Sequence, residues 1–95
     1  MDDLKKLSLK AYRAIFEGKK TISINDVEYP IKKFSSGLRY VDLLGYRFIE
    51  QNPKKQSQWA KKTQEGHKIM WGFKGRKYIA QVFDGDFKDL RKKRI

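Results

Sequence analysis

The chain has 95 residues, with 23 Lys and Arg against 11 Asp and Glu and a formal net charge of +12. This length predicts a single domain, and the lack of cysteine together with only one histidine excludes disulfide bonds and a thiolate or imidazole metal cage, so we expect no metal and no cofactor. No apolar run is long enough to cross a membrane, and the first residues, MDDLKK, lack the apolar segment of a secretion signal, so we expect a soluble cytoplasmic protein.

The positive charge is concentrated in the middle of a sequence that otherwise has the composition of a folded protein. Residues 51–82 contain eight Lys or Arg and a single Glu, while 39% of the whole chain is hydrophobic and 14% is aromatic. A folded and strongly cationic domain attracts polyanions, of which nucleic acid is the first candidate. The alternative is that the lysines serve only solubility.

Residues 3–17 are predicted to form an amphipathic helix. Apolar residues recur there at spacings of three and four, which is the period of a helix with one buried face. Asp2 and Asp3 suit its start, and Gly18 suits its end. The residues on the expected buried face are Leu4, Leu7, Ala11, Ala14 and Ile15.

Residues 21–31 change to a period of two, which predicts a β-hairpin with its turn at Asn25-Asp26. The expected pairs are Ile24 with Val27 and Ile22 with Tyr29, all four facing the core together with Ile31. Pro30 cannot donate a backbone hydrogen bond, so the second strand is expected at a sheet edge, which leaves a homodimer through that edge open.

The next two segments are predicted to be a pair of strands and a second helix. The stretch LRYVDLLGYRFIEQN, residues 38–52, is rich in strand-forming side chains, and Gly45 within it marks either a turn or a bulge. We expect two strands joined there. Residues 52–66 predict a short helix, in which Trp59 is the apolar anchor. Its outward face is expected to carry Lys54, Lys55, Lys61 and Lys62.

The stretch HKIMWGFKGRKYIAQV, residues 67–82, predicts the final hairpin, with its turn at Lys74-Gly75. The face expected to be core consists of Ile69, Trp71, Phe73, Tyr78, Ala80 and Val82. The opposite face then consists of Lys68, Met70, Gly72, Lys77, Ile79 and Gln81. Met70 and Ile79 either form an apolar patch on that outer face or are covered by the first helix. A slip of one residue in the register would exchange the two faces.

Together these elements predict one α+β domain over residues 1–87, followed by a basic tail over residues 88–95. The N-terminal helix packs on an antiparallel or mixed sheet of five or six strands, which can curl into a half-barrel. The second short helix is inserted before the final hairpin, and a further turn is expected at Asp84-Gly85.

The composition and these elements predict a non-enzymatic nucleic-acid-binding protein with little sequence specificity. Lysine acts as a point charge on phosphates, so the expected recognition is of the backbone. A basic sheet can also follow single strands, but such sheets use aromatic platforms. The expected binding residues are Lys54, Lys55, Lys61, Lys62, Lys68, Met70, Arg76 and Lys77.

Two alternatives remain from the sequence. The stretch RYVDLLGYRFI, residues 39–49, followed by GHKIMW, resembles the strand-rich part of the small ribosome-dependent ribonuclease toxins. The resemblance implies RNA cleavage that involves Arg47, His67 and Tyr78. We do not assign the chain to that family, because a hairpin is predicted where those proteins continue with a second helix. The other alternative is an adaptor that docks on an acidic protein.

Overall fold

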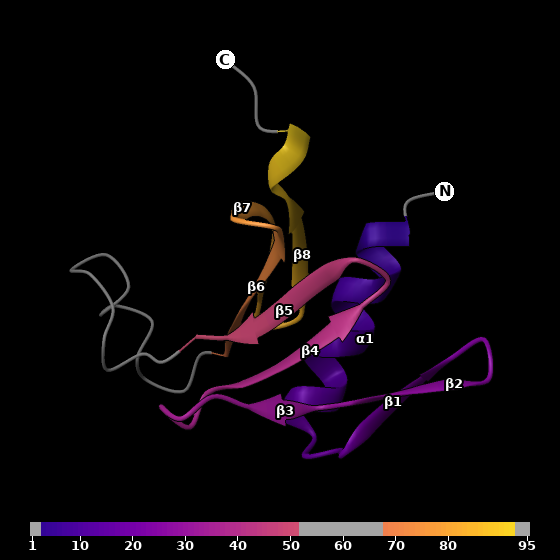
Figure 1. The fold of residues 1–95 in the computed structure, drawn as a ribbon. Coiled ribbons are helices and arrows are strands. Elements are labelled where there is room, and N and C mark those ends of the chain that lie inside the picture. Colours follow the sequence, from indigo (N-terminus) through magenta and orange to yellow (C-terminus); the bar gives the residue numbers. More distant parts are fainter. Residues whose placement is uncertain (1–2, 52–67, 93–95) are drawn as a thin grey trace.

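A computed structural model describes residues 3–51 and 68–92, which form one helix layered against an antiparallel sheet (Figure 1). This architecture confirms the predicted α+β class and the N-terminal helix. The elements are α1 (Asp3–Phe16), β1 (Thr21–Ile24), β2 (Val27–Pro30), β3 (Lys32–Lys33), β4 (Arg39–Leu43), β5 (Tyr46–Glu50), β6 (Ile69–Lys74), β7 (Lys77–Phe83), β8 (Asp86–Asp89) and the 3₁₀ turn η2 (Leu90–Lys92).

The helix α1 buries the face that the sequence predicts and ends in a hydrogen-bonded cap. Gly18 has a positive φ of 78°, which only glycine adopts freely, and it allows two bonds that satisfy the last carbonyls. The Gly18 N–H donates to Ile15 O over 3.3 Å, and the Lys19 N–H donates to Ala14 O over 2.9 Å. The chain therefore leaves the helix in a fixed direction and enters β1.

The strands form two sheets, one with the order β1-β2 and one with the order β3-β4-β5-β6-β7-β8. In Figure 1 the strands β6–β8 run steeply relative to β3–β5, so the larger sheet curls around α1. Helix α1 fills the hollow of this curl, and its apolar stripe meets Val41, Leu43 and Phe48 of the sheet. The core is thus a helix held in a curved antiparallel sheet.

Both early hairpins have the turns that the sequence predicts. Ile22 pairs with Tyr29 around the turn at Asn25-Asp26, and Leu43 pairs with Tyr46, so Gly45 marks a turn and not a bulge. The prediction that all apolar residues of the first hairpin are core is wrong at Val27, which is 51% exposed.

The predicted register of the last hairpin is wrong, and the error exchanges the two faces of β6. The turn residues are Gly75-Arg76, because Lys74 pairs with Lys77, and the register shifts between Gly72 and Phe73. Gly75 takes the first turn position with φ of 63°, the position that a II′ hairpin turn reserves for glycine. Along β6, Met70 and Gly72 therefore face the core, whereas the side chains of Trp71 and Phe73 point away from it.

The inner residues of β7 also follow from this register. A bulge gives β7 one extra residue, and Ile79 and Ala80 are both buried in the core beside Met70. Of the two alternatives for Met70 and Ile79, burial beneath α1 is the one that the structure shows. The core also leaves no room at Gly72, where an added Cβ would lie 3.0 Å from the Phe48 ring and 3.1 Å from the Ala80 Cβ.

Two predicted segments lie partly or wholly outside the described residues. The second helix, expected over residues 52–66, is one of them. The tail was expected from residue 88, but β8 continues to Asp89 and η2 carries the backbone to Lys92. In the described part of the chain, no helix has the length and apolarity needed to cross a membrane.

Candidate functional site

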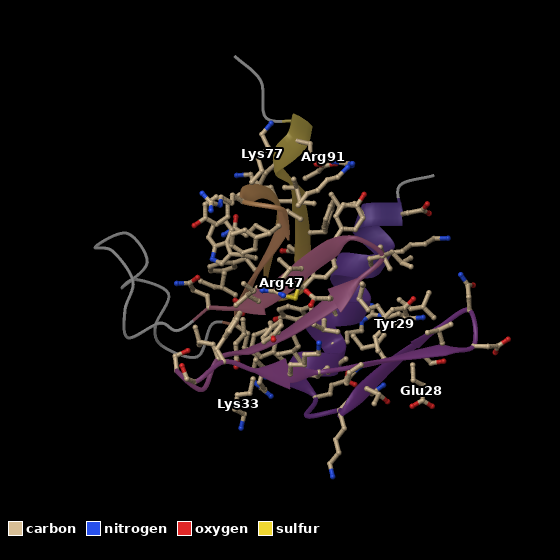
Figure 2. All side chains as sticks on the ribbon, viewed as in Figure 1. Glu28, Tyr29, Lys33, Arg47, Lys77 and Arg91 are labelled. Carbon is tan, nitrogen blue, oxygen red and sulfur yellow. The ribbon has the colours of Figure 1, made fainter. Side chains whose placement is uncertain are left out.

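The side of the large sheet that faces away from α1 carries a row of rings. Side chains alternate along a strand, so the neighbours of the core residues on β4, β5 and β6 point outward. We call this surface the aromatic face. It consists of Phe34, Tyr40, Arg47, Ile49, Trp71, Phe73 and Tyr78. Figure 2 looks onto this side of β4 and β5, with α1 behind them and Arg47 labelled near the middle.

Three rings from the last hairpin form the first cluster of the aromatic face. The Tyr78 ring lies 5.2 Å from the Trp71 ring, edge to face, and 4.7 Å from the Phe73 ring, measured between centroids. These geometries are the favourable ones for aromatic pairs. Trp71 and Phe73 are half-buried, whereas Tyr78 is 58% exposed. The cluster is therefore preformed and still presents ring surface to solvent.

A second cluster lies at the other side of the aromatic face. Phe34 and Tyr40 stack with their centroids 4.0 Å apart and their planes within 16°. The Arg47 guanidinium carbon lies 4.6 Å from the Tyr40 centroid, a cation–π distance. Two hydrogen bonds to Asp42, of 2.7 and 3.1 Å, hold that guanidinium in place and raise the pKa of Arg47, so it stays charged. This cluster offers flat rings with a fixed positive charge above them.

The pairing of the strands sets the distance between the two clusters. Tyr40 pairs with Ile49, and Ile49 pairs with Trp71, so the three lie in one row across β4, β5 and β6. Neighbouring strands are about 4.8 Å apart, which separates Tyr40 from Trp71 by about 10 Å. A ligand that contacts both clusters must therefore extend across the strands.

Cations lie around the aromatic face. Three exposed cations lie at the hairpin tip between β6 and β7. Each edge strand, β3 and β8, adds one more. These two face the same way as the rings, because Lys32 pairs with Tyr40, and Lys88 pairs with Gln81, which itself pairs with Trp71. Figure 2 labels Lys77 at the top of the view, where β7 begins. Within residues 3–51 and 68–92, none of these five forms a salt bridge. They are Lys32, Lys74, Arg76, Lys77 and Lys88.

The structure brings together only some of the residues that the sequence singled out. Lys54, Lys55, Lys61 and Lys62 lie outside the described residues. Arg76 and Lys77 lie together at the hairpin tip. Lys68 precedes β6 at its opposite end, about 20 Å away along the strand, where its ammonium lies 5.9 Å from the Phe16 ring. Met70 is 0% exposed, so its side chain is part of the core and not of a binding surface.

Sequence reasoning missed the aromatic face because it placed Trp71, Phe73 and Tyr78 in the core. Apolar residues occur on both alternating faces of β6 and β7, so the sequence pattern allowed either face to be the buried one. The signal that distinguishes them is Gly72, because the inner face must leave space where the Phe48 ring crosses the strand. The position of Gly75 at the first place of the turn was the second signal.

The ionisable groups of the inner face are structural. Arg39 donates to both carboxylate oxygens of Glu50 over 2.9 Å and to Ile15 O, at the end of α1, over 2.6 Å. Burial alone would raise the pKa of Glu50, but the hydrogen bonds and charge of Arg39, with the charge of Lys33, outweigh it and lower that pKa. The described residues also contain no group of three His, Asp or Glu that could hold a metal ion.

Comparison of the chain with protein-family models, with curated proteins and with solved structures gave no match. The side chains of the aromatic face and the charges around it are therefore what indicates a function.

Proposed function

We propose that the protein is a non-enzymatic nucleic-acid-binding module that holds single strands on the aromatic face. The observation that supports this function best is the combination of two ring clusters on one open sheet face with unpaired cations around it. Proteins that bind single strands without sequence preference use the same combination, in which bases stack on rings and positive groups follow the backbone.

Each part of the surface has a distinct task in this proposal. One base stacks on the exposed Tyr78 ring, which Trp71 and Phe73 support from below. A second base stacks at Tyr40, where Arg47 adds a cation–π contribution. Because every base has a π-face, rings of this kind discriminate little between sequences.

The cations of the hairpin tip and of the edge strands neutralise phosphates between and beyond the two clusters. Each phosphate contact on a single strand contributes about −0.7 to the slope of log affinity against log salt. Between three and five such contacts give a slope of about −2 to −3.5. The bases of duplex nucleic acid stay paired and stacked on each other. A duplex therefore binds through its phosphates alone and lacks the affinity that stacking on the rings adds.

The test measures fluorescence anisotropy of labelled single-stranded and double-stranded DNA and RNA over a series of salt concentrations. We expect single strands to bind more tightly than duplexes, and Tyr78→Ala to weaken single-strand binding about tenfold, since stacking contributes about 1–3 kcal/mol per base. Val27→Ala is the control, because Val27 is exposed to a similar extent as Tyr78, 51% against 58%, and lies on β2 outside the aromatic face. Equal losses in both variants, or a preference for duplexes, would contradict the proposal.

One observation favours the ribonuclease alternative. Arg47 and Tyr78 both pair with Phe73, so the two residues lie on the same face with their backbones about 10 Å apart. His67, the third residue of that hypothesis, lies outside the described residues. Labelled RNA incubated with the protein decides between the two functions. Cleavage that is lost in Tyr78→Phe while binding is retained would establish the ribonuclease, and intact RNA would support the binding module.

A further inference from the structure

A second surface of the molecule, separate from the aromatic face, forms a groove beside α1. The groove has a volume of about 930 Å³ and lies between α1, β1 and the turn that joins β4 to β5. Figure 1 shows the β1–β2 hairpin diverging from the N-terminal half of α1. The nucleic-acid proposal makes no use of this surface.

One wall of the groove is the side of α1 that carries three cations, with Asp3 and Glu17 at the two ends of this row. Lys6, Lys10 and Arg13 are spaced at i, i+4 and i+7, which places them on one side of the helix over about 10 Å. All three are exposed, and none has a salt bridge among the residues that the structure describes. The Lys10 ammonium donates to Ser23 O of β1 over 3.3 Å, so it bridges the groove. This wall is suited to a row of carboxylates.

The groove lining also includes aliphatic side chains from α1, β1 and the β4–β5 turn, among polar ones such as Thr21, Ser23 and Asn25, and one of the aliphatic residues is an unusual leucine. Leu9 and Ile24 are half-buried, and Leu44 is 55% exposed. Leu44 has a φ of 51° in the first position of its turn, a left-handed conformation that asparagine and glycine adopt at a lower cost. A bulky side chain that is both strained and exposed beside a groove points to a contact outside the chain.

We infer that this groove docks an acidic amphipathic helix of a partner protein. Carboxylates at i, i+4 and i+7 of such a helix meet Lys6, Lys10 and Arg13, and its neighbouring apolar stripe meets Leu9, Ile24 and Leu44. The groove has no aromatic ring among its lining residues, so it lacks the stacking platform that a nucleic acid needs. The complementarity between these cations and the carboxylates of the helix therefore favours a protein partner. The aliphatic lining residues favour a helix with one apolar face.

The test uses a fluorescein-labelled helical peptide of about 16 residues, which spans about 24 Å, with Glu at i, i+4 and i+7 and Leu on the adjoining stripe. A second peptide carries Gln in place of each Glu. We expect the Glu peptide to bind more tightly than the Gln peptide in anisotropy titrations. We expect Lys6→Glu combined with Arg13→Glu to weaken the Glu peptide at least about tenfold.

The matched control is Lys5→Glu combined with Lys20→Glu, which changes the net charge equally at exposed positions outside the groove lining. It should leave the affinity within about twofold, since screened charges outside the contact contribute little. Leu44→Asn separates binding from folding. It relieves the backbone strain, so thermal stability should hold or rise while the peptide binds several-fold more weakly.

Three results would overturn the inference. The first is equal affinity for the Glu and Gln peptides, and the second is an equal loss of affinity in the control double variant. The third is the opposite selectivity, in which Lys6→Glu with Arg13→Glu weakens single-stranded RNA and not the peptide. That result would assign the groove to the nucleic acid, whereas failure of RNA binding altogether would leave the peptide result unaffected.

Discussion

The two faces of the large sheet differ in composition although they alternate along the same strands. On the inner face, Phe48 is the only aromatic side chain that is fully buried among residues 3–51 and 68–92. The other fully buried side chains there are mostly aliphatic, and half-buried rings such as Tyr46 and Phe87 pack against them. On the outer face, rings from four segments cluster and remain partly exposed. Because the core is complete without them, the outer rings are available for a ligand.

The side of a sheet that buries the most apolar area is therefore not always the side with the largest side chains. Small and aliphatic residues such as Gly72, Ala80 and Val82 line the inner face, and at Gly72 the Phe48 ring and the Ala80 side chain leave no room for a larger residue. Rings on the outer face have no helix above them in the described residues. Mutations that are chemically identical on the two faces should therefore have opposite consequences for stability and binding.

The largest effect is expected from a matched pair, Phe48→Ala and Phe73→Ala. Phe48→Ala removes a ring that is 0% exposed, so we expect it to lower the free energy of unfolding by about 4 kcal/mol. Phe73→Ala removes a half-buried ring and should cost about 1 kcal/mol of stability while it weakens single-strand binding. Urea denaturation measures the change in stability, and fluorescence anisotropy measures the change in single-strand binding. Similar stability losses in the two variants would show that the outer rings belong to the core.

A smaller loss of stability is expected when a side chain is added at Gly72, which lies against the Phe48 ring and Ala80 in the core. Gly72→Val places methyl groups against the Phe48 ring, where a Cβ alone already lies at 3.0 Å. Overpacking of this kind costs about 1–3 kcal/mol. Gly75→Ala is the control for the loss of a glycine, because nothing lies within 4 Å of an added Cβ there and only the positive φ opposes it. If Gly72→Val left the thermal stability unchanged, the close approach of β5 and β6 would be wrong.

The inner ion pair predicts a dependence of stability on pH. Because the pKa of Glu50 is lower in the folded protein than its ordinary value of 4.5, the pair contributes stability above that value and loses it as the pH falls through the lowered pKa. With side chains 33% and 14% exposed, the Arg39–Glu50 pair should contribute about 2 kcal/mol, between the values for exposed and buried pairs.

Urea denaturation between about pH 6 and pH 3 measures this contribution. Glu50→Gln should be less stable than the wild type at the higher pH, and the difference should shrink as the pH falls. A difference that stays constant over this range would mean that the charge of Glu50 contributes nothing.

The smallest effect is expected at the hairpin tip. Arg76 is exposed and has no salt bridge among the described residues, so Arg76→Ala should leave thermal stability unchanged within about 0.5 kcal/mol. It should reduce the salt slope of single-strand binding by about 0.7, the share of one phosphate contact. An unchanged slope would place the phosphates elsewhere on the molecule.

The sequence predicts the helix, the antiparallel order of the early hairpins and their turns, because these depend on local periodicity and turn residues. Gly18 caps the helix, which ends at Phe16, and Asn25-Asp26 forms the turn of β1–β2, as expected. Such features require only residues that are close together in the chain.

The face of β6 could not be predicted by the same reasoning. Alternation gives two faces with apolar residues on both, and the choice between them depends on the register shift at Gly72 and on contacts with Phe48, 24 positions earlier in the chain. The aromatic face depends on the same choice, since it joins Phe34 and Tyr40 to Trp71 through three strands. The basic residues at the hairpin tip were found from composition alone, while their proximity to the rings required the fold.

The most direct test of the account is the fluorescence of Trp71 during a titration with a single-stranded RNA oligonucleotide. The wild type is compared with Trp71→Phe, which keeps a ring at that position and leaves the other tryptophan of the chain as the sole indole. We predict saturable quenching in the wild type, at the same concentration at which anisotropy reports binding, and little quenching in Trp71→Phe. Binding seen by anisotropy with identical fluorescence changes in both proteins would contradict the assignment of nucleic acid to the aromatic face.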